Sequence, residues 1–423
     1  MDRPCCSLAL LLPLLLCLCL GSIRAGSAAS VTAGTHDGSE RWGYVEVRPK
    51  AHLFWWYYKS PHRTSTKAKP WPTILWLQGG PGASGVGLGN FLEVGPLDVN
   101  LKPRNSTWLQ KADLIFVDNP VGVGYSYVED DSLLVKTDWE QAADATTLLK
   151  ALVKELPTLQ SSPLFLVAES YGGKYAATLG ASVARAIRSG KLKINLAGVA
   201  LGDSWISPED FTLSYTPLLL SVSRLDDNAG DEAKKKAEDV KRQIEAGQFA
   251  DAQGSWSDLL DFISTKSGNV DLYNFLLDSG MDPVSADTPT GSSPSSVQAL
   301  MYATYLGSQD SDSNTIDGIM NGAIKEKLKI VPKNLKWVEV SQKVDELLSY
   351  GINVTVYNGQ LDVICSTNGA EAWVQKLKWD GLKSFLSLPR QSLYCGQSKG
   401  TKAFVRSYKN LHFYWILGAG HFF

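Results

Sequence analysis

Six short apolar runs recur along the chain, and they constrain its fold more than any other feature. Each run is apolar at consecutive positions, which is typical of a strand buried on both faces of a parallel sheet. The runs lie at residues 73–78, 113–118, 164–168, 196–201, 353–357 and 412–417. Residues 139–156 and 174–187, between some of the runs, have apolar residues at helical spacing. The alternation predicts an α/β fold with a mostly parallel central sheet and helices on both faces. Residues 51–58 predict a further, antiparallel strand.

The middle of the chain departs from this alternation. Residues 226–266 are charged and helix-prone, and residues 279–312 are rich in Ser, Asp, Pro and Gly, which favours a loop. We interpret residues 207 to about 314 as one insertion that forms a helical cap over the active site. The alternative is a solvated helical excursion without a role. Residues 27–423 are predicted to form one domain that includes this insertion.

The N-terminus has the layout of a secretory signal peptide, which we predict over residues 1–26. Arg3 precedes an apolar run over residues 8–20, and small residues follow the run. A membrane anchor is the alternative, but the run contains Pro13 and is shorter than the roughly 20 residues that span a bilayer. We therefore expect export through the secretory pathway, an extracellular or a vacuolar or lysosomal destination, and no stable membrane insertion.

Glycosylation sequons and cysteines agree with secretion. Asn105 and Asn353 each begin an Asn-x-Thr sequon. Four of the six cysteines lie within the predicted signal peptide, which leaves Cys365 and Cys395. Because an oxidising compartment favours disulfides, we predict a Cys365–Cys395 bridge, with two buried free thiols as the alternative.

The charge balance argues against one class of partner. The chain has 423 residues and a formal net charge of −2, and it has no basic stripe, so nucleic-acid binding is not expected. The hydrophobic fraction of 44% is ordinary for a globular protein with a buried core. These features give no indication of the oligomeric state.

A serine stands between a predicted strand and a predicted helix, in the segment Ala168-Glu169-Ser170-Tyr171-Gly172-Gly173. A tight strand-to-helix turn presents such a serine above the sheet with its hydroxyl exposed, and the turn tolerates only small neighbours such as Gly172. Ser170 is therefore the candidate nucleophile. The alternative is that Ser170 only caps the helix.

A serine hydroxyl needs a base that takes its proton and an acid that orients the base. In hydrolases with this serine turn, the order along the chain is serine, acid, histidine. Only His412 and His421 follow Ser170, and His421 is favoured because it lies in a glycine-rich turn beyond the last apolar run. Asp362, just past a predicted strand, is the predicted acid, and Asp203 is the alternative.

Backbone amides can stabilise the negative charge that develops on a substrate oxygen. One such amide is expected at Tyr171, directly after the candidate nucleophile. Another is expected in the glycine-rich residues 78–82, which follow an early predicted strand. The alternative for residues 78–82 is an ordinary turn.

Together these segments resemble the serine carboxypeptidase family, and most closely its plant serine carboxypeptidase-like and animal retinoid-inducible groups. The matching segments follow the family's order: Trp76-Leu77-Gln78-Gly79-Gly80-Pro81-Gly82, Glu93-Val94-Gly95-Pro96, Val117-Asp118-Asn119-Pro120-Val121-Gly122, Glu169-Ser170-Tyr171-Gly172-Gly173, Asn358-Gly359-Gln360-Leu361-Asp362 and Gly418-Ala419-Gly420-His421. The resemblance implies a serine-type peptidase that releases single residues from the C-termini of peptides through an acyl-enzyme. It implies no metal and no cofactor.

The resemblance also implies roles for individual residues. The backbone amides of Gly80 and Tyr171 are implied as the oxyanion donors. A subsite for the terminal carboxylate of the substrate is implied at Gln78, the Gly79 backbone and Glu169, with Trp76 and Glu93 behind them. A protonated glutamic acid and an amide can each donate a hydrogen bond to a carboxylate, which fits this role.

The chain departs from the family pattern at three places. Gln78 replaces the usual Asn, and Ala83 stands where the family often has Cys. The family also continues beyond its histidine, whereas this sequence stops at Phe423, so a truncated C-terminus and an inactive truncated form are expected as one alternative. An acyltransferase that uses sugar-ester donors is another, but Glu169 favours a peptidase because such transferases tend to carry Asp there.

Overall fold

The alternating apolar and helical segments fold as strands and helices in the expected order. The structure describes residues 30–64, 66, 69–279, 281, 343–396 and 400–422. The strands are β1 (Ser30–Gly34), β2 (Glu40–Arg48), β3 (Ala51–Tyr58), β4 (Thr73–Leu77), β5 (Asp113–Val117), β6 (Tyr127–Val128), β7 (Pro163–Glu169), β8 (Asn195–Gly202), β9 (Asn353–Gly359), β10 (Gln391–Leu393), β11 (Ala403–Tyr408) and β12 (Leu411–Ile416). The helices are η1 (Gly85–Val94), η2 (Trp108–Gln110), η3 (Asp131–Leu133), α2 (Asp138–Glu155), η4 (Pro157–Gln160), α3 (Gly172–Arg188), α4 (Pro208–Ser221), α5 (Asp227–Glu245), α6 (Phe249–Lys266), α11 (Val344–Ser349), α12 (Thr367–Gln375) and α13 (Leu382–Ser387).

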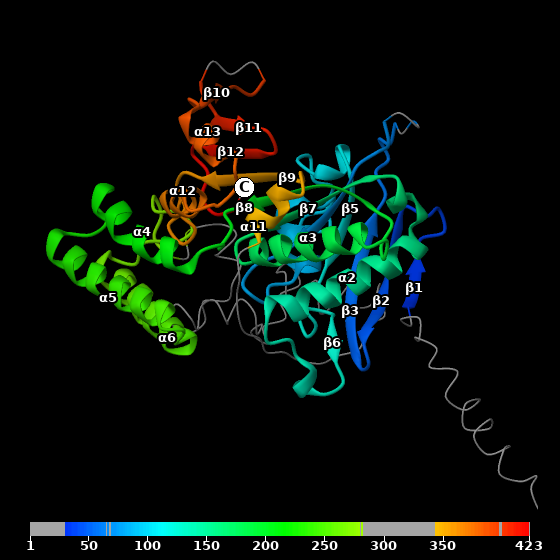
Figure 1. The fold of residues 1–423 in the computed structure, drawn as a ribbon, viewed down its shortest axis with the longest axis horizontal. Helices are drawn as coiled ribbons and strands as arrows, with labels where there is room; N and C mark the ends of the chain where they lie inside the picture. The colour runs from blue at the N-terminus through cyan, green and yellow to red at the C-terminus, as the bar shows by residue number, and fades with distance from the viewer. Residues whose placement is uncertain are drawn as a thin grey trace, which may run out of the picture.

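In this computed structural model, the strands of the described residues form one sheet (Figure 1). Their order is β1-β2-β3-β5-β4-β7-β8-β9-β12-β11-β10, and β6 pairs with β3. The strands β5, β4, β7, β8, β9 and β12 pair in parallel, whereas both outer parts of the sheet are antiparallel. Each predicted apolar run forms one strand of the parallel centre, and residues 51–58 form the antiparallel β3. The predicted α/β fold class is therefore confirmed.

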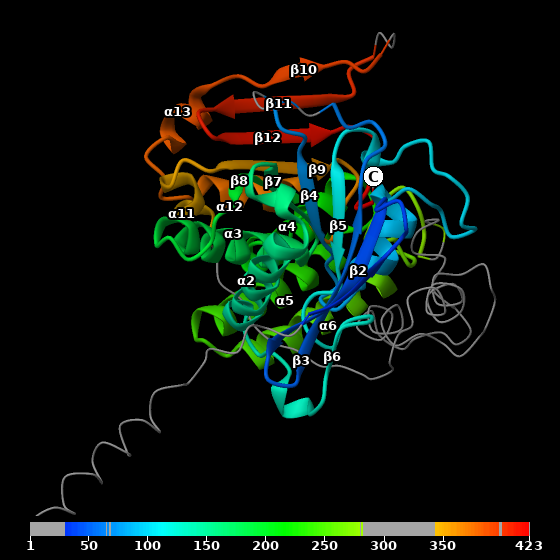
Figure 2. The ribbon, with the colours of Figure 1, turned by 90° about the vertical axis from the view of Figure 1, so that its right-hand side faces the viewer.

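The sheet buries side chains on both of its faces. In β3, Leu53 and Trp55 pack into one core, and the alternate residues Phe54 and Trp56 pack into another. Helices α2 and α3 cover the first face, and η1 lies against β4 and β5 on the second. Figure 2 shows α2 and α3 stacked beside the central strands. Burial on both faces explains why these strands are apolar at consecutive positions.

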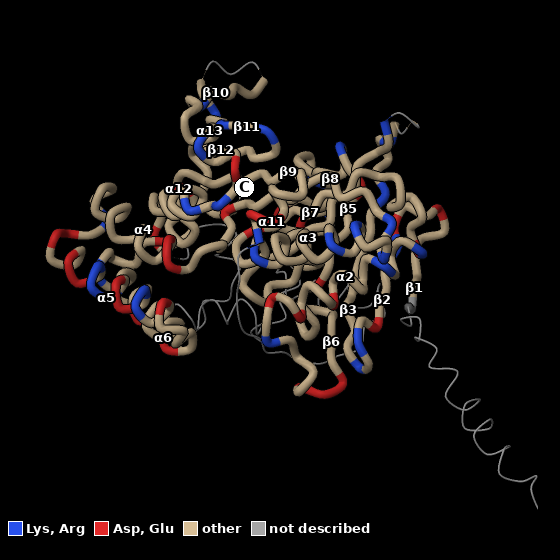
Figure 3. Tube along the Cα trace, viewed as in Figure 1, with Lys and Arg blue, Asp and Glu red and all other residues tan. Residues whose placement is uncertain are grey.

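Helices α4, α5 and α6 form a unit at one side of the sheet (Figure 1). They pack against one another in chain order, and α12 packs on α4. Aromatic contacts fix the unit: Trp205 stacks on Phe211 with ring centroids 5.1 Å apart, and Trp256 Nε1 donates to Tyr215 Oη over 3.2 Å. Acidic and basic side chains are interspersed along α5 (Figure 3).

These helices are the described part of the predicted insertion. The remainder of the insertion, up to about residue 314, lies outside the described residues, and so does the predicted signal peptide. The role of the insertion as a cap stays a prediction. No described helix is long and apolar enough to cross a membrane.

The predicted disulfide between Cys365 and Cys395 is wrong, because both residues are free thiols. Cys365 is buried in the loop after β9, whereas Cys395 is exposed after β10, three positions away in the strand order. At about 4.8 Å per strand the separation is roughly 14 Å. The Cα atoms of a disulfide lie only about 4.4–6.8 Å apart. The alternative of two buried thiols holds for Cys365 alone.

Both predicted sequon asparagines are exposed. Asn105 lies in the turn before η2, and Asn353 begins β9. Asn353 Nδ2 donates to Ala197 O over 3.1 Å, which uses one of its two amide hydrogens. Glycosylation itself stays a prediction at both sites.

The central position of β7 generates a stability prediction. Leu166 in β7 has no solvent exposure. We expect Leu166→Ala to lower the free energy of unfolding by about 2–5 kcal/mol, because the substitution removes buried surface and leaves a cavity. Leu276→Ala is the matched control, since that side chain is 64% exposed and its loss should change stability by less than about 0.5 kcal/mol. Urea denaturation of both variants measures the difference, and equal effects would contradict the assigned core.

Candidate active site

Ser170 lies at the turn between β7 and α3 in a strained backbone conformation. Its φ is 57°, in the left-handed region that residues other than glycine rarely adopt. Ser170 N donates to Gly202 O over 3.1 Å, and Trp205 N donates to Ser170 O over 2.8 Å, so the segment after β8 fixes the turn. Helix α3 begins at Gly172 with Tyr171 as its N-cap residue. The alternative of Ser170 as a helix cap is therefore wrong.

Two glycines allow the backbone to approach this turn closely. A Cβ atom at Gly172 would lie 2.2 Å from Leu77 O, and one at Gly79 would lie 2.5 Å from Ser170 Cβ. Both separations are far shorter than the roughly 3.5–4.0 Å of an optimal contact, so a larger residue would displace the chain. The glycine-rich segment after β4 therefore lies directly against Ser170.

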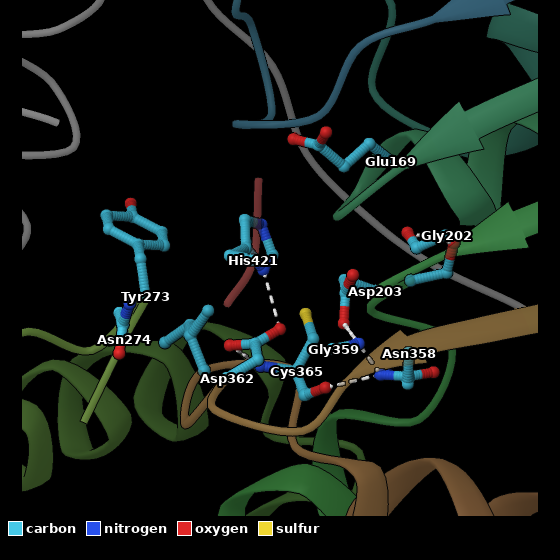
Figure 4. Close-up of polar contacts among 12 residues, drawn as sticks. Glu169, Gly202, Asp203, Tyr273, Asn274, Asn358, Gly359, Asp362, Cys365 and His421 are labelled. Atoms are coloured by element: carbon cyan, nitrogen blue, oxygen red, sulfur yellow. Dashed lines mark hydrogen bonds and ion pairs between the residues drawn. The ribbon is translucent and has the colours of Figure 1, made fainter. Parts of the chain in front are cut away.

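His421 and Asp362 form a buried hydrogen-bonded pair (Figure 4). His421 Nδ1 donates to Asp362 Oδ2 over 2.7 Å, and the residues are 2% and 0% exposed. Cys365 N donates to Asp362 Oδ1 over 3.1 Å. His421 N donates to Tyr273 O over 2.8 Å, and the ring of Tyr273 lies 5.1 Å from the imidazole. These contacts hold both the carboxylate and the imidazole in one orientation.

The alternative acid and base candidates have other partners. His412 lies on β12, where its Nδ1 bonds with Ser407 Oγ over 3.0 Å, and burial lowers its pKa. Asp203 accepts hydrogen bonds from Asn358 Nδ2 and Gly359 N at 3.0 and 2.8 Å. The imidazole of His421 donates instead to Asp362, so the geometry favours the pair of Asp362 and His421.

The side chain of Cys365 lies close both to Ser170 and to this pair. The Ser170 side chain is within hydrogen-bonding reach of the Cys365 thiol. The sulfur of Cys365, a carboxylate oxygen of Asp362 and a ring nitrogen of His421 all lie within 4.8 Å of one another. Burial raises the pKa of the Cys365 thiol well above its ordinary value, which keeps it neutral. Ser170, Asp362 and His421 are thus brought to one place.

Asp118 holds the start of η1 beside the glycine-rich segment. Its Oδ1 accepts from Ser84 Oγ over 2.5 Å and from Val86 N over 3.0 Å, and its Oδ2 accepts from Tyr125 N over 2.8 Å. Burial raises the pKa of Asp118 to about 6. Gly80 in the adjoining segment has a φ of 106°, a conformation that favours glycine.

The predicted donors to an oxyanion lie on adjoining backbone segments. A Cβ atom at Gly79 would lie 2.8 Å from Tyr171 N, so the glycine-rich segment passes directly beside this amide. Gly80 is the next residue of the same segment. The alternative of an ordinary turn does not account for this close approach.

A chain of polar side chains lies next to Ser170. Trp76 Nε1 donates to Gln78 Oε1 over 2.7 Å, and Gln78 Nε2 donates to Glu169 Oε1 over 3.1 Å. Glu93 on η1 lies within hydrogen-bonding reach of Glu169. Burial and the neighbouring Glu93 carboxylate raise the pKa of Glu169 well above its ordinary value, and burial raises the pKa of Glu93 as well. The pair therefore retains a proton where exposed glutamates would be fully ionised.

The same segments carry the similarity to known proteins. Residues 31–423 match the serine carboxypeptidase family over nearly the whole described chain. The chain belongs to the serine carboxypeptidase family. Serine carboxypeptidase-like 51 from Arabidopsis thaliana is 56% identical over 432 residues, which cover 96% of this chain and 93% of that protein. The retinoid-inducible serine carboxypeptidase from Homo sapiens is 43% identical over 433 residues, which cover 97% and 92%.

A solved structure agrees in fold. The crystal structure of Kex1Δp, a prohormone-processing carboxypeptidase from Saccharomyces cerevisiae, aligns with a TM-score of 0.68 and 21% identity. The alignment covers 90% of this chain and 87% of that one. Kex1Δp has an α/β-hydrolase fold, and this serine carboxypeptidase shares it.

The structure of this serine carboxypeptidase gathers the predicted site residues at one edge of the sheet. They are Ser170, Asp362, His421, Gly79, Gly80, Tyr171, Trp76, Gln78, Glu93 and Glu169. Sequence reasoning missed the contact of Tyr273 with His421, for which no sequence signal exists. It also missed Cys365 as a site residue, although its place three residues after Asp362 was a usable signal.

The approach of Gly79 to Ser170 generates a prediction for this serine carboxypeptidase. Gly79→Ala should slow labelling of Ser170 by an organophosphorus reagent by about 10²-fold or more, since a displacement of about 1 Å can cost that much in rate. Gly254→Ala is the matched control, because a Cβ atom there meets nothing within 4 Å. Labelling rates of the two purified variants are compared with the wild type. An unchanged rate in Gly79→Ala would contradict the tight contact.

Proposed function

We propose that Ser170 is the nucleophile, His421 the general base and Asp362 the residue that orients the base, in a peptidase acting at peptide C-termini. The observation that carries this proposal is the 2.7 Å bond from His421 Nδ1 to Asp362 Oδ2 beside the strained Ser170 turn. Membership in the serine carboxypeptidase family supports it independently. Acid, base and serine together are the groups that acyl transfer requires.

The reaction would proceed in two steps. In the first, Ser170 Oγ attacks the carbonyl of the last peptide bond while His421 Nε2 takes the hydroxyl proton. The backbone amides of Gly80 and Tyr171 would donate to the resulting oxyanion. His421 then gives its proton to the departing amine, and the C–N bond breaks to leave an acyl-enzyme. In the second step, His421 activates a water molecule that releases the acyl group and restores Ser170.

A carboxylate subsite would select the chain end. We assign it to Gln78, the Gly79 amide and Glu169, because their donors lie beside Ser170. Trp76 fixes the amide of Gln78 by donating to Oε1, which leaves Nε2 as the donor. Burial and the neighbouring Glu93 keep Glu169 protonated, so that it can donate to the terminal carboxylate rather than repel it. The longer side chain of Gln78, where the family usually has Asn, thus retains a donor at this position.

We further propose that the enzyme works within or beyond the secretory pathway. The predicted signal peptide and the exposed sequon residues Asn105 and Asn353 support this location. Peptides are the substrate class that the family implies. Mass spectrometry of peptides from protein secreted by eukaryotic cells would test both the cleavage of residues 1–26 and the glycans.

The role of Ser170 is tested by Ser170→Ala. We expect kcat for peptide hydrolysis to fall by about 10⁴-fold or more, because the residues of a catalytic triad act as a unit. Ser221→Ala, at an exposed position that ends α4, is the matched control and should retain full activity. Melting curves establish that both variants fold. Wild-type turnover in Ser170→Ala would overturn the assignment.

The raised pKa of Glu169 predicts a pH dependence of substrate binding. Below that pKa Glu169 is protonated and donates to the substrate carboxylate; as pH rises through it, the donor is lost and two negative charges face each other. KM for a free-acid peptide should therefore rise with pH, whereas KM for the matched peptide amide should not. In Glu169→Gln, which keeps a neutral donor, the rise should flatten. Parallel curves for acid and amide would refute carboxylate recognition and favour the acyltransferase alternative.

A further inference from the structure

Asp203 is a buried carboxyl that the proposed mechanism does not use. It directly follows β8, has no solvent exposure and adopts a φ of 34°, which is unusual for a residue other than glycine. Its Oδ1 accepts from Gly359 N over 2.8 Å and from Asn358 Nδ2 over 3.0 Å. Its own N–H donates to Tyr357 O over 2.9 Å. Three bonds therefore attach Asp203 to the end of β9.

Asp203 connects the turn after β7, which carries Ser170, with the turn after β9, which carries Asp362. On one side, Gly202 O accepts from Ser170 N. On the other, Asn358 Nδ2 donates to Cys365 O over 2.7 Å as well as to Asp203. Cys365 N in turn donates to Asp362 Oδ1 (Figure 4). Asn358 thus links Asp203 by hydrogen bonds to the loop that presents Asp362 to His421.

The second oxygen of Asp203 has a different environment. Within the described chain, no donor reaches the buried Oδ2 of Asp203. The carboxyl lies instead within hydrogen-bonding reach of Asp362. A buried oxygen with an acceptor beside it and no donor is satisfied when it carries a proton itself. Asp362 already accepts from His421 and Cys365 and has further lone pairs available for such a donor.

The charges around Asp203 favour the same state. Among the described residues, the ionisable side chains that face it are Asp362, Cys365, Glu169 at the end of β7 and Tyr357 on β9, and His421 bonds to Asp362. The first four are acids, so none of them supplies a positive charge. Burial and the neighbouring Asp362 carboxylate raise the pKa of Asp203 well above its ordinary value.

We propose that Asp203 is a positioning residue for the reaction: it stays protonated and donates a hydrogen bond to the Asp362 carboxylate. The inference rests on the proposed roles of Asp362 and His421 and adds a residue that the mechanism above does not contain. The bond disperses the negative charge of Asp362 and holds the carboxylate against His421. His421 is then held in the orientation in which it can take the Ser170 proton.

Replacing Asp203 shifts the pH dependence of acylation in opposite directions, depending on whether Asp203 is protonated or ionised. If neutral Asp203 donates to Asp362, its removal leaves a more basic carboxylate that favours the imidazolium, and the acid limb of the acylation rate moves to higher pH. If Asp203 is instead ionised, its removal takes away a negative charge, and the acid limb moves to lower pH. If Asp203 only supports the loop, its replacement lowers the acylation rate without shifting the acid limb of the pH profile.

The experiment compares Asp203→Asn, Asp203→Ala and Asp144→Ala. Asparagine keeps an acceptor for Gly359 and offers a neutral donor to Asp362. Asp144 is an equally buried control that bonds Arg48 at the end of β2. The rate of organophosphorus labelling of Ser170 is measured against pH, alongside kcat/KM for a free-acid peptide. Melting curves accompany each variant.

Asp203→Ala should label about 10- to 100-fold more slowly, with the acid limb raised by up to about one pH unit. Asp203→Asn should restore most of the wild-type labelling rate, and its acid limb should lie at the wild-type pH. Asp144→Ala should lose stability without moving the limb. A limb that falls in Asp203→Asn, or stays fixed in Asp203→Ala, overturns the proposal. Because labelling needs no peptide, wild-type labelling without peptide cleavage would refute the proposed substrate and still test Asp203.

Discussion

The parallel register of β4, β7, β8 and β9 is the constraint on which the site depends. It sets Glu169 beside Gly202 and Gly202 beside Tyr357 at the edge where these strands end. Since parallel strands end at the same edge, the turn after each strand lies beside the turn after its neighbour. The bonds from Ser170 N to Gly202 O and from Asp203 N to Tyr357 O join consecutive turns. A slip of one residue would turn every side chain to the opposite face and dissolve this arrangement.

A second constraint follows from burying four carboxyl groups together. Glu93, Glu169, Asp203 and Asp362 are each at most 7% exposed. Fully ionised, such a group would be costly, because burial and like charges both disfavour the anions. Retained protons and neutral amide donors lower that cost: Gln78 donates to Glu169, and Asn358 donates to Asp203. The amides near the site are therefore as much part of its electrostatics as the acids.

Much of this architecture could be predicted from the sequence, because burial on both faces of a parallel strand leaves a visible run of apolar residues. The order of Ser170, Asp362 and His421 along the chain was similarly informative. The pairing of Cys365 with Cys395 failed because an even number of cysteines carries no information about distance. Asp203 was a competitor for the role of Asp362 because both follow parallel strands, and only the register decides which carboxylate reaches the imidazole.

The strand order also dictates when the chemistry can first arise during synthesis. The turn that carries Ser170 is complete once β7, β8 and α3 have formed, but its partners arrive with β9 and with the segment after β12, far later in the chain. A hydroxyl without its base is a poor nucleophile, so under the proposed roles a growing chain that already displays Ser170 cannot yet react. The contacts that bring Asp362 and His421 to Ser170 join distant parts of the chain and form late, because long loops must close first. Hydrolytic competence in this protein is thus a property of the finished sheet and does not precede it.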